Sequence, residues 1–209
     1  MTTNPIQAVL FDMGGTLEDT QSDDAIREEA IRGLRALLRQ RSLDPGLSLQ
    51  DLQSTVASGF GAYHSWRDQS EIELAPAIVW SKYVLGDQCP SRERLLASAE
   101  EIAFFYETHN HTRRLRPEAP ATLEALRKLG FRLAIISNVN SRRLVPCKLA
   151  EYGIAHYFDA VVTSSGLGWR KPNERIFHEA AHLMHQPPHA CAYVGDTVSR
   201  DVIGARRAG

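Results

Sequence analysis

One aspartate stands where a carboxylate can be presented to a phosphate group. The stretch AVLFDMGGTLEDT, residues 8–20, leads from an apolar run into a glycine-rich turn, and Asp12 lies at the junction. A carboxylate placed there can act as a nucleophile, which divides one difficult displacement into two easier ones. Two residues later, at the position where we look for a second carboxylate, the sequence has Gly14.

Three more short apolar runs end directly before small or polar residues. LAII precedes Ser137 and Asn138, AVV precedes residues 163–164, and AYV precedes Gly195 and Asp196. Short, continuously apolar runs are typical of strands that are covered on both faces of a sheet.

Helical patterns alternate with these runs in the second half of the chain, at residues 117–130, 141–153 and 173–184. The alternation predicts an α/β fold, a Rossmann-like parallel sheet with helices on both faces. Ligands of such sheets bind beyond the carboxyl ends of the strands, where the strand order reverses. We therefore expect the polar residues at the four strand ends to converge on one rim.

The first two apolar runs are separated by a stretch far longer than one crossover helix requires. Residues 22–42 predict a helix, with Ser22 as a cap candidate, acids in the first turn and arginines in the last. Its apolar positions share one face: Ile26, Ala30, Leu34, Leu37 and Leu38.

Further helices are expected at residues 48–60, 71–86 and 91–108. The insert therefore reads as a small helical bundle. We expect an α/β core domain of residues 1–19 and 114–209, with residues 20–113 inserted as a helical bundle cap domain.

Composition limits the classes of function. With 43% hydrophobic residues, 23% charged residues and a net charge of −1, the chain has no basic excess to attract nucleic acid or an anionic membrane. No leader pattern and no apolar run of about 18 residues is visible, so a cytoplasmic protein is expected. The cysteines, Cys89, Cys147 and Cys191, are odd in number and widely spaced, which favours neither a disulfide framework nor a zinc site.

The order of four motifs resembles the haloacid dehalogenase-like (HAD) hydrolase superfamily. Asp12 lies in FDMGGT, Ser137 in IISN, Lys171 in RKPNERIF, and Asp196 and Asp201 in VGDTVSRD. One such motif occurs by chance, whereas four in the right order at strand ends are specific. The resemblance covers residues 6–18 and 114–209, and the insert lies where that superfamily has its helical cap. It also implies a further strand and helix after Gly209.

The resemblance implies an aspartyl-phosphate formed on Asp12 and Mg²⁺ as the cofactor. Oxygen ligands suit Mg²⁺, and the expected ones are the carboxylates of Asp12 and Asp196 with the main-chain carbonyl of Gly14. That carbonyl does not depend on a side chain, so a glycine can supply it.

The other motif residues are expected to form a phosphate cradle. Lys171 would place positive charge on the phosphate oxygens and hold Asp12 ionised. Ser137 and the amides after it, beginning at Asn138, would donate hydrogen bonds to the same oxygens. Asp201 is expected to support the site by orienting Lys171 or a metal-bound water.

Gly14 departs from the superfamily pattern, in which most phosphatases carry a second aspartate that protonates the leaving group. General acid–base help is worth about 10²–10⁴-fold in rate. Three outcomes are open: another acid, Glu18 or Asp19, substitutes; the substrate has a good leaving group, such as an acyl phosphate; or the site binds phosphate without useful turnover.

The function expected from these residues is that of a Mg²⁺-dependent phosphatase of a small phosphorylated metabolite, acting as a monomer or homodimer. One alternative is a 2-haloacid dehalogenase-like enzyme, since a halide leaves without protonation, although those enzymes usually have a tyrosine in place of Gly14. A second is a phosphonate-cleaving hydrolase, with Lys82, the single lysine of the insert, forming a Schiff base. A third is a catalytically weak phosphate-binding or regulatory protein.

Overall fold

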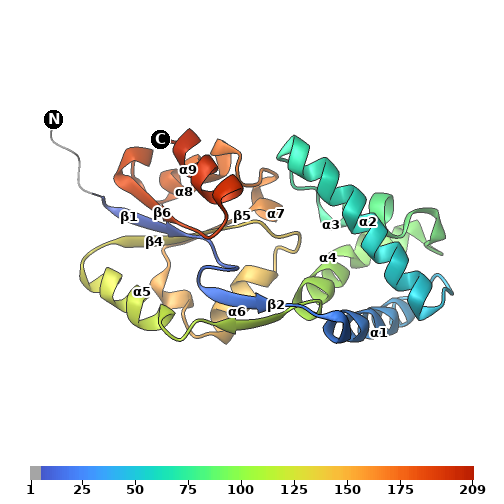
Figure 1. Cartoon of the computed structure of the whole chain (residues 1–209). Helices are drawn as coiled ribbons and strands as arrows, with labels where there is room; N and C mark the ends of the chain where they lie inside the picture. Colours follow the sequence, from blue (N-terminus) through green and yellow to red (C-terminus); the bar gives the residue numbers. More distant parts are fainter. Residues whose placement is uncertain (1–5) are drawn as a thin grey trace. The chain divides into compact units, whose positions relative to one another are not determined.

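The computed structural model describes residues 6–209, and the chain divides into two compact units (Figure 1). The sheet unit contains the residues up to Thr20 together with Arg113–Val139 and Arg143–Gly209, and the helical unit contains Gln21–Thr112 and Asn140–Arg142. The boundaries expected from the sequence differ by one residue from these. The short segment Asn140–Arg142 groups with the helical unit although it follows a strand of the sheet unit, which no pattern in the sequence indicates.

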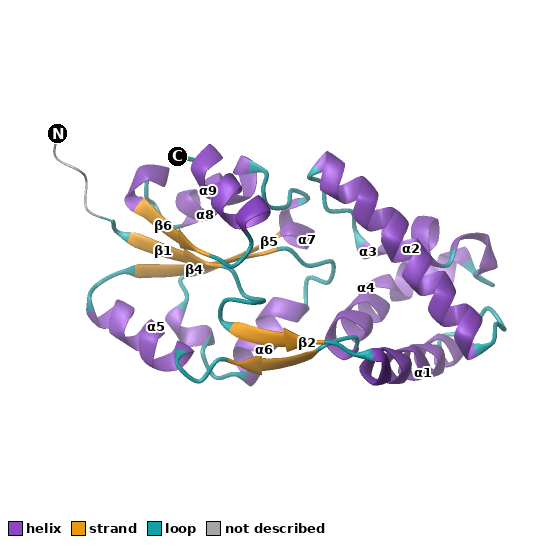
Figure 2. Cartoon of the chain, viewed as in Figure 1, coloured by secondary structure: helices purple, strands orange, loops and turns teal. Residues whose placement is uncertain are grey.

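Parallel strands form the main sheet of the sheet unit (Figure 2). Within residues 6–209 there are four, in the order β5 (Ala160–Thr163), β4 (Arg132–Ser137), β1 (Ala8–Phe11) and β6 (Cys191–Val194). The chain adds β4 and β5 on one side of β1 and β6 on the other, so the strand order reverses at β1. The α/β fold with a Rossmann-like parallel sheet is thereby confirmed.

Side chains that alternate along β1 reach both faces of the sheet. Val9 and Phe11 pack in a cluster with residues of α5 (Ala119–Lys128) and α6 (Leu144–Glu151). Ala8 and Leu10 pack on the opposite face with residues of α8 (Glu174–Leu183) and α9 (Ile203–Arg207). Figure 1 shows these two helix pairs on opposite sides of the strands. Burial on both faces explains why the strands are continuously apolar.

The connecting elements of the sheet unit are short. They are the one-turn helices η3 (Ala155–Tyr157), α7 (Ser164–Leu167), η4 (Pro188–Ala190) and η5 (Val198–Val202). A separate two-stranded sheet joins β2 (Glu18–Gln21) to β3 (Thr112–Leu115), the segments by which the chain leaves the sheet unit and returns to it.

The helical unit surrounds its own apolar core. Its elements are α1 (Asp24–Gln40), α2 (Leu49–Ser70), α3 (Pro76–Ile78), η1 (Val79–Val84), η2 (Gly86–Gln88) and α4 (Arg92–His109). Leu34 and Leu38 of α1, Val56 of α2, Trp80 of η1 and Ile102 of α4 are all fully buried in one cluster.

Two details of the helical unit differ from the expectation. The cap of α1 is Asp23, whose carboxylate accepts a hydrogen bond from the Ile26 N–H, whereas the Ser22 hydroxyl donates to the Asn110 carbonyl at 2.8 Å. Ser22 was therefore the wrong cap: it lies one residue before the cap, and its hydroxyl contacts a residue distant in sequence. Helix α2 continues to Ser70, where Glu71 in the left-handed conformation (φ 55°) ends it.

No helix in the described part of the chain has both the length and the apolar character that crossing a membrane requires.

Candidate active site

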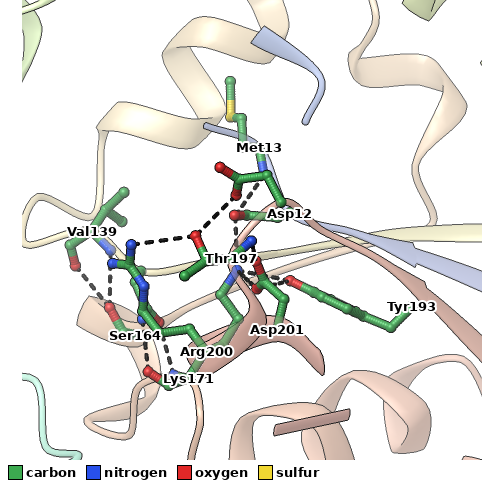
Figure 3. A network of polar contacts seen from close by, with 11 residues as sticks. Asp12, Met13, Val139, Ser164, Lys171, Tyr193, Thr197, Arg200 and Asp201 are labelled. Atoms are coloured by element: carbon green, nitrogen blue, oxygen red, sulfur yellow. Dashed lines mark hydrogen bonds and ion pairs between the residues drawn. The ribbon is translucent and has the colours of Figure 1, made fainter. Parts of the chain in front are cut away.

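A buried lysine joins two aspartates at the carboxyl rim of the sheet (Figure 3). The Nζ atom of Lys171 lies 2.8 Å from Oδ1 of Asp12, at the end of β1, and 2.8 Å from Oδ1 of Asp201, in η5. The side chains of Lys171 and Asp201 are 2% and 1% exposed, whereas that of Asp12 is 13% exposed. Asp12 is therefore the member of this cluster that solvent or a ligand can reach.

The three charges have unequal effects on the two carboxyl groups. Burial raises the pKa of Asp12 above its usual value, and the ammonium of Lys171 offsets only part of that rise. Burial would also raise the pKa of Asp201, but Lys171, together with a hydrogen bond from the Thr197 N–H, outweighs it and lowers the pKa. Lys171 thus favours the ionised form of Asp12, and the role predicted for that lysine stays a prediction.

Asp196 follows β6 on the same rim and is exposed. Ligand atoms of Asp12, Asp196 and Asp201 all lie within 4.8 Å of one another. Gly15 permits this arrangement, because its φ is 81° and a Cβ atom there would lie 2.7 Å from Cγ of Asp196.

An all-oxygen donor set with this spacing fits a hard divalent cation such as Mg²⁺. Asp12 and Asp196 are the carboxylates best able to hold one. Oδ1 of Asp201 already accepts from Lys171, and its Oδ2 accepts from the Thr197 N–H. The ligand role predicted for Asp12, Gly14 and Asp196, and the support role of Asp201, stay predictions that this geometry favours.

Asn138 fixes the main chain at Lys171. Its side-chain amide donates to the Lys171 carbonyl at 3.0 Å, and its carbonyl oxygen accepts from the Lys171 N–H at 2.9 Å. Ser137 ends β4 beside β1, pairs in register with Thr163 and is 5% exposed. The phosphate-binding roles of Ser137 and Asn138 stay predictions, and the structure adds a positioning role for the Asn138 side chain.

Tyr193 was missed by the sequence reasoning. Lys171 Nζ donates to its hydroxyl at 2.7 Å, and that hydroxyl donates to Asp201 at 3.0 Å. Burial, followed by the carboxylates of Asp12 and Asp201, raises the pKa of Tyr193 far above its usual value, so the hydroxyl keeps its proton. The available signal was a tyrosine in the otherwise apolar run before Gly195 and Asp196.

Ser164 was noted only as a polar residue after a strand. Its fully buried hydroxyl donates to the Val139 carbonyl at 3.0 Å and accepts from the Val139 N–H at 3.0 Å. Figure 3 shows this pair beside the Lys171 cluster. Ser164 thus holds the loop that follows Ser137.

The sequence model of a hydrolase family described as "haloacid dehalogenase-like hydrolase" matches residues 6–209, nearly the whole chain. The chain belongs to the haloacid dehalogenase-like hydrolase family.

Individual relatives agree with this membership. A glyceraldehyde 3-phosphate phosphatase of Methanopyrus kandleri is 31% identical over 208 residues, which cover 98% of this chain and 81% of that protein. A haloacid dehalogenase-like hydrolase domain-containing protein 3 of Bos taurus is 47% identical over 91 residues, 44% of this chain and 36% of that protein. Among solved structures, a 2-haloacid dehalogenase from Pseudomonas syringae pv. tomato DC3000 is similar, with a TM-score of 0.68, 26% identity and coverage of 98% of this chain and 84% of that one.

Two acidic residues follow Gly14 in β2, Glu18 and Asp19. Glu18 is 1% exposed, forms an ion pair with Arg113 and accepts a hydrogen bond from the Tyr152 hydroxyl at 2.7 Å. Asp19 forms an ion pair with Arg116 at 2.9 Å. Both candidates for a substitute acid are therefore engaged in contacts of β2 with other segments.

The alternative nucleophile, Lys82, belongs to the helical unit. It is exposed, and its ammonium lies 5.4 Å from the centroid of the Tyr83 ring. A Schiff base at Lys82 gains no support from these surroundings, because the amine is exposed rather than buried in an apolar pocket.

Proposed function

We propose that this chain is a Mg²⁺-dependent phosphatase of a small phosphorylated molecule, with Asp12 as the nucleophile. The observation that carries the proposal is the contact of one buried lysine, Lys171, with Asp12 and Asp201 at 2.8 Å each, at the point where the strand order reverses. The helical unit is proposed to be the cap of the helical-cap subgroup.

The chain's own residues account for most of the chemistry. Two contacts orient the carboxylate of Asp12 through Oδ1: the Met13 N–H donates at 2.7 Å, and Lys171 lies at 2.8 Å. In the first step a carboxylate oxygen of Asp12 bonds to phosphorus, and the bond from phosphorus to the leaving oxygen breaks with its electron pair on that oxygen. In the second step water attacks the same phosphorus, which releases phosphate and regenerates Asp12.

Charge on the transferring phosphoryl group has to be balanced. Lys171 contributes one positive charge beside Asp12, and Ser137 with the amides after it would donate hydrogen bonds to the phosphoryl oxygens. Mg²⁺, held by Asp12, Asp196 and the Gly14 carbonyl, would neutralise the remaining charge. The relative named glyceraldehyde 3-phosphate phosphatase supports a small phosphorylated substrate.

The test is hydrolysis of a panel of phosphate esters and acyl phosphates, with and without Mg²⁺, by the wild type and Asp12→Asn. We expect metal-dependent phosphate release that is lost in the variant, because an amide oxygen is a poor nucleophile. Folding of the variant is checked by circular dichroism. Phosphate binding without turnover of any substrate would contradict the proposal and favour a binding protein.

A second candidate function is displacement of halide from 2-haloacids. The similar 2-haloacid dehalogenase structure favours it, and a halide leaves without a proton, so Gly14 is no obstacle. Chloride release from 2-chloropropionate by the wild type, and its loss in Asp12→Asn, would support this candidate. A lack of chloride release alongside phosphate release would exclude it.

A further inference from the structure

Position 14 has room for a side chain but carries none. A Cβ atom built on Gly14 meets, among the described residues other than its chain neighbours, only Cγ2 of Thr20, at 4.0 Å. The φ of Gly14 is not positive, so an L-residue at this position would not be forced into the left-handed conformation. A proton donor at this position is therefore missing without steric cause.

The two carboxyl groups that follow Gly14, those of Glu18 and Asp19 in β2, already have partners. The oxygens of Glu18 accept from Arg113 and Tyr152, and Arg116 pairs with Asp19. In all three contacts the carboxylate faces a donor group: Arg113 lies in β3, Arg116 directly follows it, and Tyr152 is at the end of α6. Both carboxylates are thus held by partners within the sheet unit.

Three ionisable side chains on the rim, Lys171, Tyr193 and Asp196, have other contacts or an expected role as a cation ligand. Lys171 donates to Asp12, Asp201 and Tyr193, and the proton of Tyr193 is donated to Asp201. Asp196 is the exposed carboxylate best able to hold a cation. In the described part of the sheet unit, the rim thus supplies the nucleophile and the positive charge, and position 14 offers no acid.

We infer that the natural substrate is an acyl phosphate, a mixed anhydride of a carboxylic acid and phosphoric acid. The inference rests on the proposed function. When Asp12 bonds to phosphorus, the bond to the acyl oxygen breaks and its electron pair remains on a carboxylate. A carboxylic acid with a pKa of about 4 needs no proton to leave at neutral pH.

The energetics of the first step point the same way. The phosphorylated Asp12 is itself an acyl phosphate, so transfer from an acyl phosphate exchanges one mixed anhydride for another. Transfer from an alkyl ester instead expels an alkoxide, for which a general acid is worth about 10²–10⁴-fold. The missing side chain at position 14 therefore discriminates between two classes of phosphate compound.

The experiment measures kcat/KM for acetyl phosphate, 4-nitrophenyl phosphate, phenyl phosphate and glycerol 3-phosphate, whose leaving groups span a wide range of pKa. The wild type is compared with Gly14→Asp and with the matched control Gly14→Asn, which fills the same space without an acid. We expect the wild-type rate to fall steeply as the leaving-group pKa rises. In Gly14→Asp the rate on glycerol 3-phosphate, divided by the rate of the same variant on acetyl phosphate, should rise about 10²-fold above the wild-type ratio, and Gly14→Asn should show no such rise.

Each outcome decides one question. If the wild type hydrolyses glycerol 3-phosphate as well as acetyl phosphate, the inference is overturned while the proposed function stands. If Asp12→Asn leaves the release of phosphate from every substrate unchanged, the proposed function fails too. Asp19→Asn, at an exposed ion pair, should leave the dependence on leaving group unchanged, and a loss of glycerol 3-phosphate turnover there would identify Asp19 as the acid. Should Gly14→Asp not fold, the wild-type dependence still decides.

Discussion

At the scale of single residues, the Tyr193 hydroxyl completes the hydrogen bonds of Lys171. Tyr193→Phe removes one acceptor from Lys171 and one donor to Asp201, but both ion pairs of the lysine remain. We expect kcat to fall less than about tenfold and the free energy of unfolding to fall by about 1 kcal/mol, measured by steady-state kinetics and urea unfolding. Tyr83→Phe in the helical unit is the control. A loss of activity as large as that of Lys171→Met would instead make the hydroxyl a catalytic group.

Glu18 is the second residue whose role can be tested alone. Because its buried carboxylate pairs with Arg113 and accepts from Tyr152, Glu18→Gln should lower the free energy of unfolding by about 2–4 kcal/mol. The expected kcat on acetyl phosphate is unchanged. Asp19→Asn, whose pair with Arg116 is half exposed, should cost at most about 1 kcal/mol. A stable Glu18→Gln protein with reduced kcat would show that Glu18 acts on the substrate.

Residue types and spacing made the proximity of Asp12, Lys171, Asp196 and Asp201 predictable, since each follows an apolar run or lies in a recognisable motif, and their roles stay predictions. The engagement of Glu18 was not predictable, because the hydroxyl that it accepts from lies 134 positions away in the sequence. Tyr193 was missed for a related reason. Its hydrogen bonds depend on the position of Lys171 in the folded chain, and a local sequence pattern does not indicate that position.

At the scale of elements, the strands were the most predictable part of the fold. Burial on both faces makes them continuously apolar, so β1, β4, β5 and β6 stand out in the sequence. Element ends were less predictable, because a cap depends on which of several polar residues reaches the helix. At α1 the cap is Asp23, one residue after the predicted Ser22, whose hydroxyl contacts Asn110 instead.

Helix α4 binds a segment that the sequence would assign to the sheet unit. The Glu107 carboxylate accepts from the N–H groups of Asn140 and Ser141 at 2.8 and 2.7 Å. Glu107→Gln replaces one charged acceptor by an amide donor and should lower the free energy of unfolding by about 1–3 kcal/mol. Thermal unfolding measures this, with Glu93→Gln in the first turn of α4 as the control. Equal stability of the two variants would show that the segment is held by other contacts.

At the scale of the whole molecule, each unit has its own core. The cluster of the helical unit contains Leu34, Trp80 and Ile102, and the two clusters of the sheet unit lie on either face of β1. Separate cores can open with separate free energies. Separate opening of the two units can be tested at Asn140–Arg142. This segment belongs to the helical unit but directly follows residues of the sheet unit, so neighbouring amides should respond to different units.

Ile102 of α4 and Ile135 of β4 are both fully buried, one in each unit. Truncation of either to alanine should cost about 2–5 kcal/mol. Hydrogen exchange is expected to accelerate in Ile102→Ala at helical-unit amides, including those of Asn140 and Ser141, while the amides of β4 keep their protection. In Ile135→Ala the pattern should reverse. Equal acceleration of exchange throughout the chain in both variants would mean that the two units unfold as one cooperative body. Residues up to Val139 and the segment Asn140–Arg142 would then open with the same free energy.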